Sequence, residues 1–177
     1  GPRIQEGDFV RAQITTVSRD GIAVVVGGVD TRVHLHALTF EYLVDARTKY
    51  KVGQEIMVQV EQIIKEKDGH HIVEVNCKQP ELERAKQMRS ALPIGSIVFG
   101  VVSSVTANKK VAGNINLVAY IKMYDLPVLV NNMPAKFLGS EPTRGSTVRL
   151  RVLNYLDNGM ILCRCIGTQG PMNFPNA

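Results

Sequence analysis

The fold of this chain can be predicted from one segment, GDFVRAQITTVSRDGIAVVVGGVDTRVHLHALTF, which covers residues 7–40. Apolar and polar residues alternate on both sides of Asp20-Gly21, and a second pair of turn-forming residues follows at Gly27-Gly28. Alternation with a period of two is typical of strands with one buried face, and such residue pairs are typical of tight turns. The segment therefore predicts three short strands joined by turns.

Parts of this segment recur in the second half of the chain. GDFVRAQITTV, residues 7–17, aligns with GSIVFGVVSSV, residues 95–105. Further along, VGQEIMVQV, residues 52–60, aligns with RGSTVRLRV, residues 144–152. Each copy then ends with a turn and an alternating strand. Matching beginnings and ends in the same order predict two copies of one fold.

Each copy is predicted to form a small β-barrel. About five short strands rich in β-branched residues are separated by Gly, Asn and Asp turns. Five such strands close most economically into a barrel, because closure removes exposed edges. A short helix or turn is expected over residues 37–50, and a helix from Pro80 to Ala91 between the copies. The predicted divisions are a first barrel at residues 3–79, a helical linker at 80–93, a second barrel at 94–170 and a tail at 171–177.

Composition argues against a membrane protein or a disulfide-rich one. No apolar run approaches the roughly 20 residues that span a bilayer, so no membrane partner is expected. Cys77, Cys163 and Cys165 are interpreted as buried, reduced thiols of a cytoplasmic protein. Gly1-Pro2 is interpreted as a remnant of tag removal, so we expect the chain to be a piece of a longer protein.

The sequence contains no recognisable catalytic motif. Phosphate loops of the Walker type, a nucleophile elbow and an HExxH helix are all missing from it. His34 and His36 lie two residues apart, but no carboxylate or cysteine is placed to complete a metal site with them. We therefore expect a binding protein rather than an enzyme, without a cofactor or a metal ion.

The first copy resembles the S1 RNA-binding domain over roughly residues 6–78. The motifs that carry the resemblance are Gly7-x-Phe9-Val10, Val33-His34-Leu35 and Lys51-Val52-Gly53-Gln54, with Gly21 in the second strand. The resemblance implies an OB-fold barrel for this copy. The second copy matches the pattern only at its ends, so it is interpreted as a degenerate S1-like barrel. The predicted fold class is thus all-β, with two tandem five-stranded OB-fold barrels.

The resemblance also implies where RNA would bind. In the family, RNA lies across strands two and three, held by two aromatic rings, a histidine and nearby basic residues. His34 matches the histidine, whereas the two ring positions fall on Asp20 and Ala23, and a negative charge at Asp20 repels phosphate. Arg19 and Arg32 flank this place and are expected to compensate in part.

Basic residues are concentrated in the second copy. Through residue 79 the chain has ten basic and eleven acidic residues, whereas from residue 94 on it has eight basic and three acidic residues. A polyanion is therefore expected to prefer the second copy. Arg149 and Arg151 alternate with apolar residues, which predicts that both project from the solvent face of one strand. Tyr120 and Lys122 share a face with Tyr124 if that segment is extended.

Two hypotheses follow. The first is a non-enzymatic, cytoplasmic protein that binds single-stranded RNA or DNA, mainly through the second copy. The second is a protein-docking adaptor that recruits a partner to a ribosome, transcription or mobile-element assembly. The candidate nucleic-acid-binding residues are Arg19, Arg32, His34, Lys109, Lys110, Tyr120, Lys122, Arg149 and Arg151.

Overall fold

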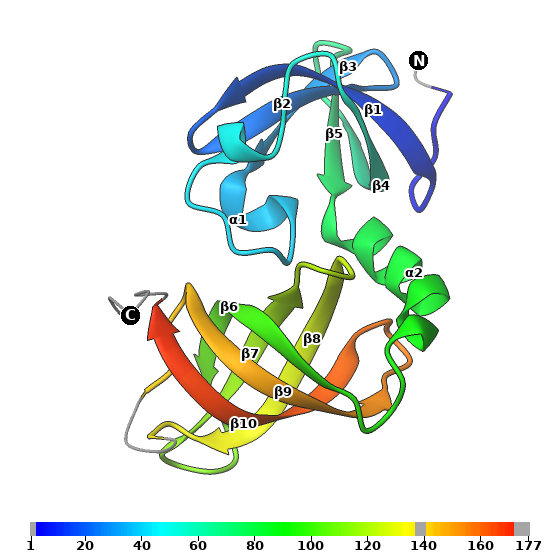
Figure 1. Ribbon diagram of the computed structural model, residues 1–177. Helices are drawn as coiled ribbons and strands as arrows, with labels where there is room; N and C mark the ends of the chain where they lie inside the picture. Colours follow the sequence, from blue (N-terminus) through cyan, green and yellow to red (C-terminus); the bar gives the residue numbers. More distant parts are fainter. Residues whose placement is uncertain (1–2, 137–140, 172–177) are drawn as a thin grey trace. The chain divides into compact units, whose positions relative to one another are not determined.

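The computed structural model describes residues 3–136 and 141–171. The chain forms two compact units, Gly1–Thr39 with Leu43–Pro80 and Phe40–Tyr42 with Glu81–Ala177. Each unit is built around five strands, so the predicted all-β class with two five-stranded barrels is confirmed (Figure 1). The predicted tail beyond residue 171 lies outside the described residues. Among those residues, no helix has both the length and the apolar character that crossing a membrane requires.

The first unit is an antiparallel sheet curled into a nearly closed barrel (Figure 1). Hydrogen-bonded strands follow the order β3-β2-β1-β4-β5, and β3 packs beside β5 at the seam without a hydrogen-bonded ladder. The predicted helix or turn before β4 consists of two short helices. The elements are β1 (Phe9–Ser18), β2 (Gly21–Val26), β3 (Val29–His34), α1 (Leu35–Leu38), η1 (Ala46–Thr48), β4 (Glu55–Lys65) and β5 (His71–Asn76).

The second unit has the same strand connectivity, and its barrel is closed. The last strand, β10, pairs antiparallel with β9 and parallel with β8, and the parallel ladder joins Ile161, Leu162 and Cys163 to β8. Its elements are α2 (Lys78–Met88), which begins in the first unit, η2 (Arg89–Ala91), β6 (Ile97–Ala107), β7 (Asn114–Ile121), β8 (Leu126–Pro134), β9 (Ser146–Tyr155) and β10 (Ile161–Pro171).

Each barrel encloses its own apolar core. Ile14, Val24 and Val58 are buried in the first core, and Leu117 and Leu150 in the second. These residues come from alternating strand positions, because every second side chain of a strand points to the same face. Burying a Val, Ile or Leu side chain contributes roughly 1.5–3 kcal/mol, so the cores account for the alternation in the sequence.

Glycines at aligned positions make the same backbone joint in both barrels. Gly7 and Gly95 have φ values of 91° and 92°, a conformation that favours glycine. The Gly7 N–H donates to the carbonyl of Val60 at 2.7 Å, and the Gly95 N–H donates to the carbonyl of Val152 at 2.8 Å. This joint ties the entry of the first strand of each barrel to its fourth strand.

Bulges also fall at aligned positions. The first strand of each barrel has one unpaired extra residue, which is Thr15 in β1 and Ser103 in β6. The fourth strand has another, which is Glu61 in β4 and Leu153 in β9. A bulge bends a strand and strengthens its twist, as a small closed barrel requires.

Helix α2 begins two residues before the predicted Pro80. The Asn76 side chain accepts hydrogen bonds from the backbone N–H groups of Lys78 and Gln79 at 3.0 and 2.8 Å. This cap satisfies donors of the first turn, where Pro80 lacks only an N–H that would have no helical partner. Further along the helix, Ala85 is buried in the second core.

The backbone of α2 lies against the last turn of the second barrel. A Cβ atom at Gly159 would lie 2.4 Å from the carbonyl oxygen of Leu82, and Gly159 has a φ of 110°. Gly69 occupies the corresponding turn of the first barrel with a φ of 90°, but nothing lies within 4 Å of its Cβ position. The turn at Gly159 therefore requires glycine because of both its positive φ and this close contact, whereas the turn at Gly69 favours glycine only because of its φ.

Candidate nucleic-acid interface

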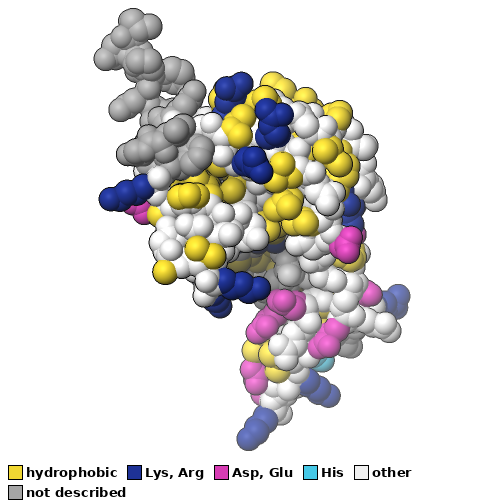
Figure 2. Space-filling model, turned by 90° about the horizontal axis from the view of Figure 1, so that it is seen from below, with side chains coloured by type: hydrophobic (Ala, Val, Ile, Leu, Met, Phe, Trp, Pro, Cys, Tyr) yellow, Lys and Arg dark blue, Asp and Glu magenta, His cyan; other side chains and the backbone are white. Residues whose placement is uncertain are grey.

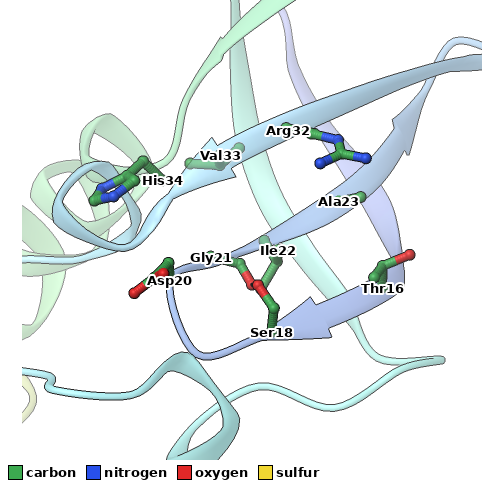
Figure 3. A pocket seen from close by; sticks show the side chains of 9 residues that line it. All are labelled: Thr16, Ser18, Asp20, Gly21, Ile22, Ala23, Arg32, Val33 and His34. Atoms are coloured by element: carbon green, nitrogen blue, oxygen red, sulfur yellow. The ribbon is translucent and has the colours of Figure 1, made fainter.

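A groove on the first barrel lies where β1, β2 and β3 meet (Figure 3). It has a volume of about 460 Å³ and coincides with the surface that the S1 resemblance implies. Its lining residues are Thr16, Ser18, Asp20, Gly21, Ile22, Ala23, Arg32, Val33 and His34.

Gly21 allows strands β2 and β3 to pair closely at one end of this groove. A Cβ atom at this position would lie 2.3 Å from the carbonyl oxygen of Val33, well inside van der Waals contact. The adjacent Asp20 carbonyl accepts a hydrogen bond from the backbone of Leu35 at 2.7 Å. These contacts set the direction in which the chain leaves β3 at His34.

Two of the predicted first-barrel residues, Arg32 and His34, line the groove together. Arg32 lies opposite Ala23 in the β2–β3 pair, and both Arg32 and His34 are exposed (Figure 3). The His34 Nδ1 atom accepts a hydrogen bond from the backbone N–H of His36 at 3.3 Å. The groove thus combines one guanidinium group and one imidazole, with the Asp20 carboxylate at its end.

Arg19 does not line the groove, although it is exposed. Its backbone carbonyl accepts a hydrogen bond from Ala46 at 2.9 Å. The pKa of nearby Asp45 is lowered to about 2, mainly by hydrogen bonds from Arg47 and to a smaller degree by the charge of Arg19. Arg19 lies outside the groove that Arg32 and His34 line.

None of the nine lining residues is Phe, Tyr or Trp. Stacking of bases on aromatic rings is a main source of affinity for single strands. Where the resemblance expects rings, the groove has the exposed Asp20 and the partly buried Ala23. The groove consequently offers a base no aromatic ring to stack on, and Arg32 and His34 are its remaining candidate contacts.

In the second barrel, Arg149 and Arg151 project from β9 into solvent. They alternate with the buried residues Val148, Leu150 and Val152. Within the described parts of the chain, neither arginine forms an ion pair. Both charges are therefore open to an anionic ligand.

A third arginine extends this row onto the next strand. Arg164 of β10 is exposed and lies directly opposite Arg151 in the antiparallel β9–β10 pair. Arg149 lies opposite Gly167, so no larger side chain separates it from its neighbours on that side. The sequence pattern does not identify Arg164, because only the strand pairing brings it beside Arg151.

Exposed apolar side chains lie on the other side of the arginine row, on β6. Phe99 pairs with Arg149, and Ile97 pairs with Arg151. The Phe99 side chain is 55% exposed. Figure 2 shows Lys and Arg side chains standing beside hydrophobic ones on the surface of the second barrel. We call Ile97, Phe99, Arg149, Arg151 and Arg164 the arginine–phenylalanine wall.

A groove of about 440 Å³ lies along β6 beside this wall. The turn after β7 forms its opposite side with Lys122, Met123 and Tyr124, and Met123 is 85% exposed. Phe99 belongs to both features, because it lines the groove and also pairs with Arg149. Phe99 was not among the predicted residues, although the alternation Ile97-Val98-Phe99 indicates that it lies on the outer face.

The structure contradicts the choice of Tyr120 as a candidate nucleic-acid-binding residue. Its side chain is 2% exposed, and its hydroxyl donates to Asp125 at 3.3 Å. Burial, with the charges of Glu81 and Asp125, raises the pKa of this phenol above its ordinary value. The shared face with Lys122 and Tyr124 does not form, because the chain leaves β7 after Ile121 and turns.

The predicted lysines of the second barrel are exposed but lie apart from the wall. The Lys122 ammonium is 3.0 Å from the Glu41 carboxylate, which neutralises part of its charge. Lys109 and Lys110 lie in the turn after β6, where the Asn108 side chain accepts hydrogen bonds from the backbone of Lys110 and Val111. These two lysines extend the positive surface without lining either groove.

Thiols and histidines do not gather into a further site. Across residues 3–136 and 141–171, no three His, Cys, Asp or Glu side chains are grouped as metal ligands would be. All three cysteines are buried and free. Burial raises the pKa of the Cys163 thiol to about 12 and also raises that of Cys165.

Comparison with solved structures gives distant similarities only. A crystal structure of a multidomain protein with nucleic acid binding domains from Streptococcus pneumoniae TIGR4 aligns with 96% of this chain at 13% identity, with a TM-score of 0.33. This chain spans 56% of that protein. The p202 HIN1 domain in complex with a 12-mer dsDNA aligns at 11% identity and a TM-score of 0.28, covering 91% of this chain and 89% of that one. Similarity at this level supports no argument about function.

The family comparison is more specific. No curated protein matches the chain. Residues 3–71, however, match the model of the family described as S1 RNA binding domain. This range contains the Val33-His34-Leu35 and Lys51-Val52-Gly53-Gln54 motifs and the whole groove of the first barrel. The resemblance predicted from those motifs is confirmed for the first barrel, because residues 3–71 match this family model.

Proposed function

We propose that this protein binds single-stranded nucleic acid, and RNA in particular, without catalysing a reaction on it. The second barrel contributes most of the affinity, and the S1 domain contributes a weaker contact through Arg32 and His34. The proposed location is the cytoplasm. The observation that carries the proposal is the row of Arg149, Arg151 and Arg164, three exposed arginines without an ion-pair partner among the described residues.

The physical basis is the release of counterions from the phosphate backbone. Each phosphate that an arginine neutralises frees about 0.7 of a counterion from a single strand, so the affinity depends on salt. The spacing of the row suits a chain of phosphates, because alternate residues of one strand lie roughly 6.5–7 Å apart on the same face. Arg149 and Arg151 have this relationship on β9. Contacts of this kind position a strand but do not read its sequence.

The S1 domain supports the same function with a smaller share of the affinity. Its family is described as RNA binding, and Arg32 and His34 line its groove. Two features lower the expected affinity there, namely the missing rings and the Asp20 carboxylate. The first barrel is therefore proposed to hold the strand in a second place rather than to initiate binding.

The test is a salt titration of binding to fluorescent single-stranded RNA and DNA, measured by anisotropy. The wild-type affinity should fall steeply as salt rises. The double variant Arg149→Ala/Arg151→Ala should bind more weakly, and its log–log salt slope should be shallower by about 1.4. Arg19→Ala/Arg32→Ala should cause a smaller loss, because only Arg32 of this pair lines the S1 groove.

Two results would contradict the proposal. If neither RNA nor DNA binds at low salt, the protein does not bind nucleic acid, and the protein-docking adaptor becomes the better hypothesis. If binding occurs but the Arg19/Arg32 variant loses more affinity than the Arg149/Arg151 variant, the main site lies on the S1 domain. A comparison of RNA with DNA of the same sequence then tests the preference for RNA.

A further inference from the structure

The groove beside Phe99 lies next to the only row of three arginines that strand pairing assembles in the described barrels. We propose that this groove receives one unpaired base, stacked on the Phe99 ring, while Arg149, Arg151 and Arg164 hold the adjoining phosphates. The inference rests on the proposed function and specifies its main site. It also assigns the protein a preference for single strands over duplexes.

The position of Phe99 is what connects stacking with phosphate binding. Its ring is 55% exposed and stands between two surfaces of different character. On one side lies Arg149, its cross-strand partner on β9, and on the other lies the groove formed with Met123 and Tyr124. A base against the ring would therefore have its own backbone directed toward the arginines. The groove volume of about 440 Å³ is within the usual range for small-molecule sites.

The arginine row is not required by the fold. Arg151 and Arg164 are directly opposite one another, and like charges in this relationship destabilise a sheet. The corresponding pair in the first barrel is Gln59 and Asn76, which is neutral and occupies the same place in the same strand pairing. Since the barrel forms with a neutral pair, the charged pair needs another explanation, and an anionic ligand supplies one.

Phe99 also differs from its counterpart in the first barrel. The aligned residue is Arg11, which lies opposite Met57 and 3.8 Å from the Glu55 carboxylate. The second barrel has Thr147 where the first has Glu55, so no acid is present at this position of the wall. The second barrel thus has Phe99 in place of Arg11 and Thr147 in place of Glu55. These differences give a surface that suits a base and a phosphate.

Stacking explains why a single strand is preferred. An aromatic ring needs the free face of a base, and in a duplex each base face is covered by its neighbours. Phosphate contacts alone would accept either form. The arginine–phenylalanine wall lies on β6, β9 and β10, and the groove beside it extends to the end of β7 and the turn that follows.

The experiment compares Phe99→Ala and Phe99→Tyr with wild type, using an oligouridine strand and a duplex of equal length. Phe99→Ala should weaken single-strand binding about five-fold or more and leave duplex binding unchanged. Phe99→Tyr should restore binding, because it retains the ring. Phe9→Ala is the matched control, since Phe9 is an exposed ring on β1 that pairs with the neutral Gln59. It should bind like wild type.

A photochemical readout locates the bound base directly, and the position of the cross-link does not depend on affinity. An oligonucleotide that contains 5-iodouridine should cross-link to the peptide with Phe99, and Arg149→Ala should lower the yield without moving the site. The inference is overturned if wild type binds single strands and Phe99→Ala binds them equally well, which leaves the proposed function intact. It is also overturned if Phe99→Ala weakens duplex binding to the same degree. If wild type binds no single strand at low salt, the proposed function and the inference fail together.

Discussion

The outer walls of the two barrels carry different chemistry on the same backbone. Gln59 and Asn76 pair across β4 and β5, whereas Arg151 and Arg164 pair at the corresponding place across β9 and β10. One pair is neutral, and the other places two positive charges side by side. The strand order, the joint glycines and the bulges are the same around both pairs.

This difference shows which residues serve the fold and which are free to serve a ligand. Core positions alternate in the same way in both barrels, because each must enclose an apolar interior. Wall positions face solvent, where a substitution changes stability by little. Charge and ring can therefore be exchanged on the wall, as at Arg11 and Phe99, while the barrel underneath stays the same.

The largest expected effect is a difference in stability between substitutions at Gly159 and Gly69, which occupy the last turns of the two barrels. Gly159→Ala should lower the free energy of unfolding by about 3 kcal/mol or more, because it adds a clash with the Leu82 backbone to an unfavourable φ. Gly69→Ala should cost only about 1–2 kcal/mol, because its turn is open. Urea unfolding followed by circular dichroism measures both. Equal losses would mean that α2 does not restrict the turn of the second barrel in solution.

The next largest effect is expected when the charged pair of the second barrel is replaced by the neutral pair of the first. Arg151→Gln/Arg164→Asn copies Gln59 and Asn76, and each lost phosphate contact should weaken single-strand binding about five-fold at 0.1 M salt. The pair should therefore lose about 25-fold in affinity. Arg11→Gln is the control, because that arginine lies on the first barrel beside Glu55 and should hardly matter. A similar loss in the control would show that general charge, rather than this wall, governs binding.

Alkaline pH should destabilise the second barrel. In the unfolded chain the Cys163 thiol ionises near pH 8.5, whereas burial raises its pKa to about 12 in the folded barrel. Above roughly pH 8.5 the unfolded state therefore binds fewer protons, and the free energy of unfolding falls by up to about 1.4 kcal/mol per pH unit for this thiol. Cys163→Val, which copies Val75 of the first barrel, should reduce the slope. An unchanged slope would exclude the thiol as its cause.

The smallest expected effect is a gain in stability, produced by the same double variant that loses affinity. Removing the like-charge pair with Arg151→Gln/Arg164→Asn should raise the free energy of unfolding by about 0.2–1 kcal/mol. The gain should shrink as salt rises, because exposed charges are screened. Thermal unfolding at low and high salt measures it. A loss of stability would show that these arginines support the barrel, which would remove the argument that a ligand explains them.

The fold could be predicted because its signals are local. Gly7 and Gly95 form turns within a few residues of the strands they begin, and alternation along one strand marks its buried face. The S1 resemblance of the first barrel rests on similarly short motifs. Helix α2 begins at Lys78 rather than at the predicted Pro80, because the side chain of Asn76, a strand residue, caps the first turn.

The candidate site could be predicted only in part, because it depends on pairing between distant strands. Arg149 and Arg151 were found from their alternation, but Phe99 and Arg164 join them only through β6–β9 and β9–β10 pairing. Tyr120 was misassigned because its side chain is buried, and the conditional alignment with Lys122 and Tyr124 fails because the strand ends at Ile121. The chain turns after Ile121, with Asp125 at a φ of 52°, and the Tyr120 ring is buried.

The seam between β3 and β5 should make the first barrel easier to open locally than the second. Because β3 and β5 pack together without a hydrogen-bonded ladder, the first barrel can open there by separating side chains alone. The second barrel has β10 bonded to β8, so opening at that place must break backbone hydrogen bonds. Amide protons of β3 and β5 that face the seam should consequently exchange with solvent faster than those of the β8–β10 ladder, which must first open. The S1 groove, formed by β1, β2 and β3, thus borders a seam that side-chain packing alone holds closed.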